Sequence, residues 1–147
     1  MISRGWGRIA VLLGAVLAGP TACTNESPSL RIIPVIPPGN APISFSSDVQ
    51  PIFTRSCAKF GCHIAATAPF GFVLEQGQAY VNLVGVPSVE DPTLKRVEPG
   101  RSDLSYIIRK LEGNAPGFRM PADGPPYLPD AEIQLIKDWI DQGALDN

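Results

Sequence analysis

The chain of 147 residues is 44% hydrophobic, and its 12 lysines and arginines against 14 acidic residues give a formal net charge of −2. This length predicts a single domain, and 16 prolines with 14 glycines predict that much of the domain is loop. Because no basic block is present, the charge pattern argues against a nucleic-acid-binding protein.

The N-terminus has the layout of an export signal. Arg4 and Arg8 make its start positive, and residues 9–18 form an uninterrupted apolar run. This run is too short to span a bilayer but has the dimensions of a secretory signal peptide. We therefore expect the protein to be exported and residues 1–22 to be removed.

Cys23 follows the small residue Ala22 directly after this segment. The segment resembles the lipobox of bacterial lipoproteins, although Pro20 stands where that family prefers an aliphatic residue. The resemblance implies a lipid anchor on Cys23 on the periplasmic side of a bacterial membrane. Thr24, in place of an acidic residue, favours the outer membrane. The alternative is ordinary cleavage after a residue such as Ala18, which leaves Cys23 as a spare thiol.

Residues 23–44 are predicted to form a tether, and residues 45–147 to form the domain. The tether contains five prolines and few charges, a composition typical of an extended, semi-rigid spacer. Such a spacer would hold the domain away from a membrane surface.

The domain is predicted to be all-α, with about four short helices and long loops rich in proline and glycine, because no stretch shows a convincing strand pattern. The first helix is expected to be capped by Ser46 or Ser47. Val49, Ile52 and Phe53 follow at helical spacing and give it one apolar stripe.

Three further helices are predicted downstream. A short one covers residues 75–84, and the next is capped by Ser102 or Asp103 and stops at Gly113. The clearest helix covers residues 130–142. Its apolar face consists of Ile133, Ile136, Trp139 and Ile140.

Two cysteines and the single histidine of the chain lie close together, with four residues between Cys57 and Cys62 and His63 directly after. This is the order in which haem c is attached: the thiols add to the two vinyl groups, and the histidine binds the iron. The usual spacing is C-x-x-C-H, and we expect Gly61 to supply the turn that absorbs the extra length. A plain disulfide or a histidine of no special role is the alternative, and a zinc site would lack its fourth ligand.

Met120 is the candidate for the sixth iron ligand. The chain has two methionines, and Met1 leaves with the signal peptide, so that Met120 is the only thioether of the mature protein. It lies in the proline-rich loop 114–129, and proline lowers the entropy lost when a loop is fixed. A thioether paired with histidine raises the potential of haem iron. The alternative is a methionine that only fills space.

Residues 45–144 resemble the c-type cytochrome domains of exported bacterial proteins and lipoproteins. The resemblance rests on residues 48–53, 61–63, 97–100, 105–111, 119–121 and 136–144, in this order and spacing. It implies a cytochrome c fold, in which the N-terminal and C-terminal helices pack together beside the haem. It also implies one haem c joined by thioethers to Cys57 and Cys62, with His63 and Met120 as axial iron ligands.

The expected function is electron transfer between redox partner proteins at a membrane, and not enzyme catalysis, because no spare base lies beside a nucleophile. Two alternatives remain: a haem-free interaction module stapled by a Cys57–Cys62 disulfide, and a haem sensor or peroxidase in which Met120 leaves the iron. Arg96, Arg101 and Arg119 are candidate partners of the haem propionates.

Overall fold

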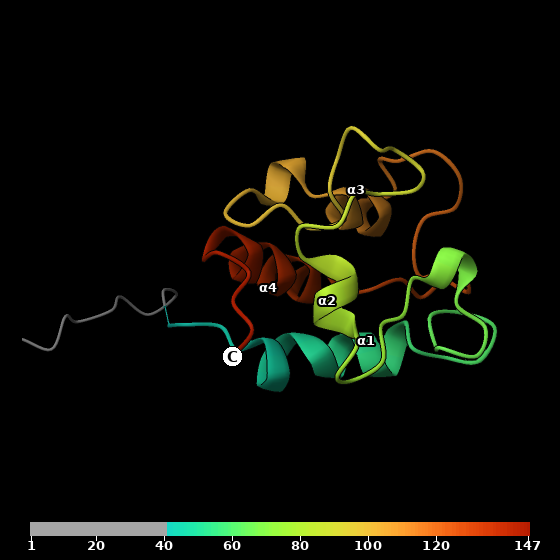
Figure 1. Ribbon diagram of the computed structural model, residues 1–147, viewed down its shortest axis with the longest axis horizontal. Coiled ribbons are helices and arrows are strands. Elements are labelled where there is room, and N and C mark those ends of the chain that lie inside the picture. Colours follow the sequence, from blue (N-terminus) through green and yellow to red (C-terminus); the bar gives the residue numbers. More distant parts are fainter. Residues whose placement is uncertain (1–40) are drawn as a thin grey trace, which may run out of the picture. The chain divides into compact units, whose positions relative to one another are not determined.

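The computed structural model describes residues 41–147; the expected signal peptide, Cys23 and most of the tether lie outside the described residues. The described part is all-α, as predicted (Figure 1). Its α-helices are α1 (Gln50–Ser56), α2 (Ala79–Leu83), α3 (Tyr106–Glu112) and α4 (Asp130–Asp141). Shorter helical turns are η1 (Phe45–Val49), η2 (Pro69–Gly71) and η3 (Ser102–Leu104). Between residues 41 and 147 there is no strand, only two isolated bridges.

The first helical segment begins earlier than predicted, and its N-cap is Ser44 instead of Ser46 or Ser47. The Oγ atom of Ser44 accepts the N–H of Ser47 at 3.2 Å, and Asp48 Oδ2 accepts the N–H of Ser44 at 2.8 Å. This reciprocal pair satisfies two backbone donors that a first turn leaves free. The segment continues directly from η1 into α1, in which Pro51 is the second residue.

The helix predicted over residues 75–84 is shorter than expected, because α2 begins only at Ala79. Gly77 has a φ of +80°, and the N–H of Ala79 donates to the carbonyl of Glu75. A left-handed residue does not continue a right-handed helix, so the chain makes a turn here first. Leu83 of α2 is fully buried.

The third helix also starts later than predicted. Ser105 has an extended backbone (φ −85°, ψ 118°) and separates η3 from α3, which begins at Tyr106. The hydroxyl of Ser105 accepts the N–H of Glu98 at 2.9 Å and donates to the carbonyl of Arg101 at 2.9 Å. These bonds hold Ser105 to the preceding loop. The predicted stop at Gly113 is confirmed by a left-handed C-cap with φ +80°.

The predicted final helix is confirmed as α4, which ends one residue before the expected end. Two acidic residues in its first turn, Asp130 and Glu132, favour the positive end of the helix. All four residues of the predicted apolar face are buried: Ile133, Ile136, Trp139 and Ile140.

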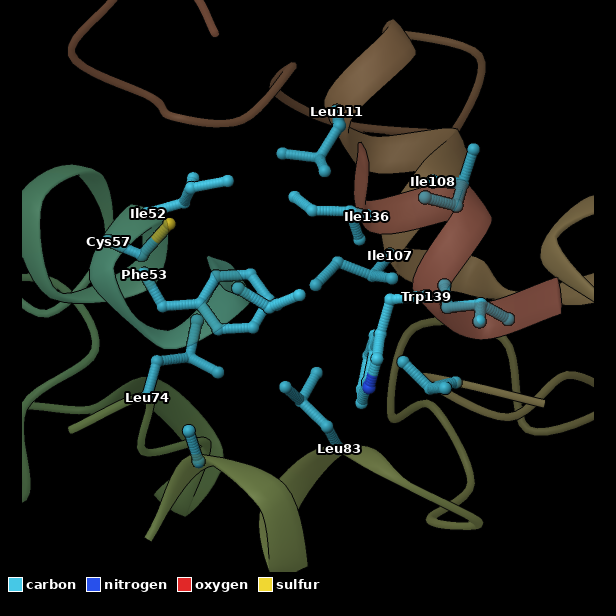
Figure 2. Close-up of a cluster of buried hydrophobic side chains, with 14 of the residues drawn as sticks. Ile52, Phe53, Cys57, Leu74, Leu83, Ile107, Ile108, Leu111, Ile136 and Trp139 are labelled. Atoms are coloured by element: carbon cyan, nitrogen blue, oxygen red, sulfur yellow. The ribbon is translucent and has the colours of Figure 1, made fainter. Parts of the chain in front are cut away.

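The four helices share one hydrophobic core. Figure 2 shows Phe53 of α1, Leu83 of α2, Ile107 of α3 and Trp139 of α4 pointing into the same cluster. Each helix is too short to be stable alone in water, so burial of these side chains is the main source of helical stability.

The two ends of the described chain pack against each other. The ring centroids of Phe45 and Trp139 are 5.1 Å apart, and the N–H of Ser46 donates to the carbonyl of Asn147 at 2.9 Å. The first helical turn therefore lies against α4 and the C-terminal residues (Figure 1). No helix between residues 41 and 147 combines the length and the apolar character needed to cross a membrane.

Candidate functional site

One cleft brings together the four haem-related residues that the sequence analysis selected in the domain. Its volume is about 220 Å³, and Cys57, Cys62, His63 and Met120 all line it. Several side chains belong both to the hydrophobic core and to the cleft wall: Phe53, Leu74, Ile107 and Leu111. The cleft is therefore an opening into the core with mainly apolar walls.

His63 is held through its Nδ1 atom, which lies 2.8 Å from the carbonyl oxygen of Phe72. A carbonyl oxygen can only accept, so Nδ1 carries the proton and Nε2 keeps its lone pair. Burial lowers the pKa of His63; the bond to Phe72 opposes this shift, and the charge of Arg96 adds to it. The imidazole is therefore mainly neutral at pH 7, the form that binds a metal.

Phe72 has a role that the sequence analysis did not identify. Its ring centroid lies 4.9 Å from that of His63 in an edge-on arrangement, and the guanidinium carbon of Arg96 lies 4.3 Å from the Phe72 ring centroid. Arg96 also donates from Nη1 to the carbonyl of Asn82 at 2.7 Å. The apolar run 72–74 was visible in the sequence, but the direction of one carbonyl oxygen was not.

The two cysteines are free thiols in different surroundings. Cys57 is buried at the C-terminal end of α1, and Cys62 is half-buried. Figure 2 shows Cys57 among the side chains of the core cluster. Burial raises the pKa of the Cys57 thiol to about 12, so this thiol is protonated at neutral pH. No disulfide joins the pair in the described part of the chain.

The residues between the cysteines form a closed loop. The N–H of Lys59 and the N–H of His63 both donate to the carbonyl of Cys57, at 2.9 and 3.1 Å. The N–H of Cys62 donates to the carbonyl of Lys59 at 2.9 Å, with Gly61 at φ +80° in the third position of this turn. The prediction that Gly61 turns the longer loop is confirmed, since this position of a tight turn favours glycine when φ is positive.

Met120 reaches the cleft from the loop that follows α3. Its N–H donates to the carbonyl of Lys110 at 2.9 Å, and the neighbouring Arg119 donates from Nε to the carbonyl of Leu111 at 2.8 Å. The guanidinium of Arg119 lies 4.3 Å from the ring centroid of Tyr127. These contacts attach the loop to the C-terminal part of α3 just before Met120.

A polar cluster beside the cleft was not predicted from the sequence. The hydroxyl of Tyr106 donates to Glu90 Oε2 at 2.9 Å, and Lys110 Nζ lies 3.0 Å from the same oxygen. Lys110 is only 8% exposed and also donates to the carbonyl of Pro116 at 3.0 Å. Burial and the bond to Glu90 raise the pKa of Tyr106 to about 12. All three members of the cluster line the cleft.

Of the three arginines considered as propionate partners, only Arg96 lines the cleft. Arg101 forms an exposed two-point ion pair with Asp103, at 2.7 and 2.8 Å. Arg119 is used in the loop contacts with Leu111 and Tyr127. Neither Arg101 nor Arg119 therefore lines the cleft, although Arg119 directly precedes Met120 in the sequence.

Among residues 41–147, no group of three or more His, Cys, Asp or Glu side chains is placed to hold a bare metal ion. The cleft provides one imidazole nitrogen, one thioether sulfur and two thiols. Comparisons of this chain with protein-family models, curated proteins and solved structures find no match.

Proposed function

We propose that this protein is a monohaem c-type cytochrome that carries electrons between redox proteins. The observation that carries the proposal is the cleft: Cys57, Cys62, His63 and Met120 were selected from the sequence, and all four line it. Met120 is 57 positions after His63 in the sequence (120 − 63), so their meeting is a property of the fold.

The state of His63 fits a haem ligand. A histidine that binds a metal almost always donates its second ring N–H to a carbonyl, a carboxylate or water, which fixes the tautomer and the ring orientation. The Nδ1 bond to Phe72 meets this requirement and leaves Nε2 for iron. A histidine must also be neutral to bind a metal. Burial lowers the pKa of His63 and so favours this neutral form.

The other lining residues fit the remaining parts of a haem. Cys57 and Cys62 would form the thioethers, each S–H adding across one vinyl double bond. Met120 would provide the sixth ligand, and thioether ligation raises the potential of the iron. Arg96 lines the cleft and would supply hydrogen-bond donors to a carboxylate of the group, whereas the donors of Tyr106 and Lys110 are already engaged with Glu90.

When bound, haem supplies an iron that cycles between Fe(III) and Fe(II). His63 and Met120 would hold the iron of this group, and the apolar walls of the cleft would limit the access of water. With two protein ligands on the iron, small ligands would be excluded and electron transfer would be favoured over oxygen chemistry.

The proposal includes a cytochrome c-like fold and a lipid anchor. The packing of Phe45 on Trp139 supports the fold, because it joins the N-terminal helical segment to the C-terminal helix. The anchor would be on Cys23 after removal of residues 1–22. The protein would then face the periplasm, with the outer membrane favoured.

A visible spectrum of the full chain, produced in a host that attaches haem c, tests this function. We expect sharp low-spin bands in the reduced form. Met120→Leu keeps a similar apolar volume but removes the sulfur, so the oxidised form should lose its thioether–iron band and the reduced form should bind CO. Leu135→Met is the matched control, because Leu135 packs against the core but does not line the cleft.

A colourless protein from this host would refute the proposal and favour the disulfide-stapled module. Coloured protein that binds CO or reacts with peroxide equally well with and without the Met120 substitution would favour the sensor or peroxidase. The control should have the spectrum of the unsubstituted protein.

A further inference from the structure

The loop between the two cysteines reaches beyond its own hydrogen bonds. Lys59 Nζ lies 3.0 Å from Asp123 Oδ2, and the two residues are separated by 64 positions in the sequence. Lys59 belongs to the residues that lengthen the cysteine spacing. Asp123 lines the cleft and follows Met120 by three positions. The ion pair therefore connects the segment of His63 to the segment of Met120.

The position of this pair complements the other attachments of the Met120 loop. Before Met120, the backbone bond to Lys110 and the Arg119 bond to Leu111 hold the loop to α3. After Met120, the bond from Lys59 to Asp123 is the only hydrogen bond from the stretch 121–128 to another segment among the described residues.

The loop that carries Lys59 is itself held by hydrogen bonds. The turn that follows Lys59 is closed by the N–H of Cys62, and the N–H of Gly61 donates to Thr67 Oγ1 at 3.0 Å. The bond to Asp123 raises the pKa of Lys59, and the same bond lowers the pKa of Asp123, so both groups are charged over a wide pH range around neutrality.

We propose that Lys59 and Asp123 form a clasp that positions Met120 as the sixth ligand, so that the two extra residues of the cysteine spacing serve to hold the distal loop. This inference rests on the proposed function. Lys59 acts here as a positioning residue through Asp123 and does not touch the iron itself.

The size of the effect follows from the exposure of the pair. The side chains are 44% and 56% exposed, and a pair in this setting is partly screened by water and salt. The clasp should therefore change the population of the form in which Met120 has left the iron by about fivefold at most. The clasp should change the equilibrium between bound and released Met120 more than it changes the free energy of unfolding of the whole domain.

The test uses the haem-loaded full chain and added imidazole, which competes with Met120 for the oxidised iron. Lys59→Gln and Asp123→Asn should each raise the apparent imidazole affinity by about two- to fivefold. The double variant should resemble the single variants, because either substitution removes the same interaction. The differences should shrink in 1 M salt.

The matched control is Arg55→Gln, which breaks a comparable exposed ion pair between Arg55 Nη2 and Glu132 Oε1 at 2.7 Å. Neither residue of that pair lines the cleft, so the imidazole affinity should stay unchanged. Equal affinities for the clasp variants and the unsubstituted protein would overturn the clasp alone, and so would additive effects of the two single substitutions. A chain that takes up no haem would overturn both the clasp and the proposed function.

Discussion

Phe72 offers a quantitative test of how the chain holds His63. Phe72→Leu keeps the carbonyl that accepts from Nδ1 and much of the apolar volume, but it removes the ring. The edge-on contact with His63 and the contact with the Arg96 cation are lost together. Such contacts contribute about 0.5–1.5 and about 0.5–1 kcal/mol. We expect the free energy of unfolding to fall by about 1–2.5 kcal/mol.

The assay is urea unfolding of the purified protein, followed by circular dichroism. Phe70→Leu is the matched control: Phe70 lines the same cleft but is 77% exposed, so its substitution should change stability by about 0.5 kcal/mol or less. If Phe72→Leu destabilises the protein no more than Phe70→Leu does, the argument from the two ring contacts is refuted. With haem bound, Phe72→Leu should keep the low-spin spectrum, because the backbone carbonyl remains.

Three other substitutions test the core, the cysteine loop and the polar cluster. Ile136 is fully buried, and Ile136→Ala should reduce the free energy of unfolding in urea by about 2–5 kcal/mol; a loss below about 1 kcal/mol would contradict the packing. Gly61 has φ +80° and open space around an added methyl group, so Gly61→Ala should cost about 1–2 kcal/mol through backbone strain alone, and unchanged stability would contradict the left-handed turn. The raised pKa of Tyr106 implies that its contribution to stability is complete below pH 10 and is lost as the pH rises towards 12. Between pH 10 and pH 12, the free energy of unfolding should therefore fall less for Tyr106→Phe than for the unsubstituted protein. Equal falls in the two proteins would contradict the raised pKa of Tyr106.

Helices with a sustained apolar pattern were predictable from the sequence, whereas their starting points were not. The apolar face of α4 repeats clearly enough to predict the helix to within one residue. The starts of the other helices depend on particular bonds: Ser44 caps η1 through Ser47, and Ser105 is held extended by Glu98. A sequence shows that serines are available as caps but not which serine finds its partner.

The same distinction applies to the site. Cys57, Cys62, His63 and Met120 were recognisable because their residue types are rare in this chain and their spacing carries chemical meaning. Phe72 acts partly through a backbone carbonyl, which has no sequence signature. Glu90, Tyr106 and Lys110 were missed as well; they meet only after the fold brings the loop at Glu90 against α3.

The measurement that tests the central claim most directly is the mass of the tryptic peptides that contain Cys57 and Cys62. Trypsin cuts after Lys59, between the two cysteines, and yields peptides 56–59 and 60–95. The protein is taken from a host that attaches haem c, denatured, digested and treated with a thiol reductant before mass spectrometry.

We predict one species with the mass of both peptides and one haem, intact in the presence of the reductant, because two thioethers hold the peptides together. A haem on only one peptide would contradict attachment at both cysteines. Two peptides without haem, linked before reduction and separated afterwards, would identify a disulfide and contradict the cytochrome assignment.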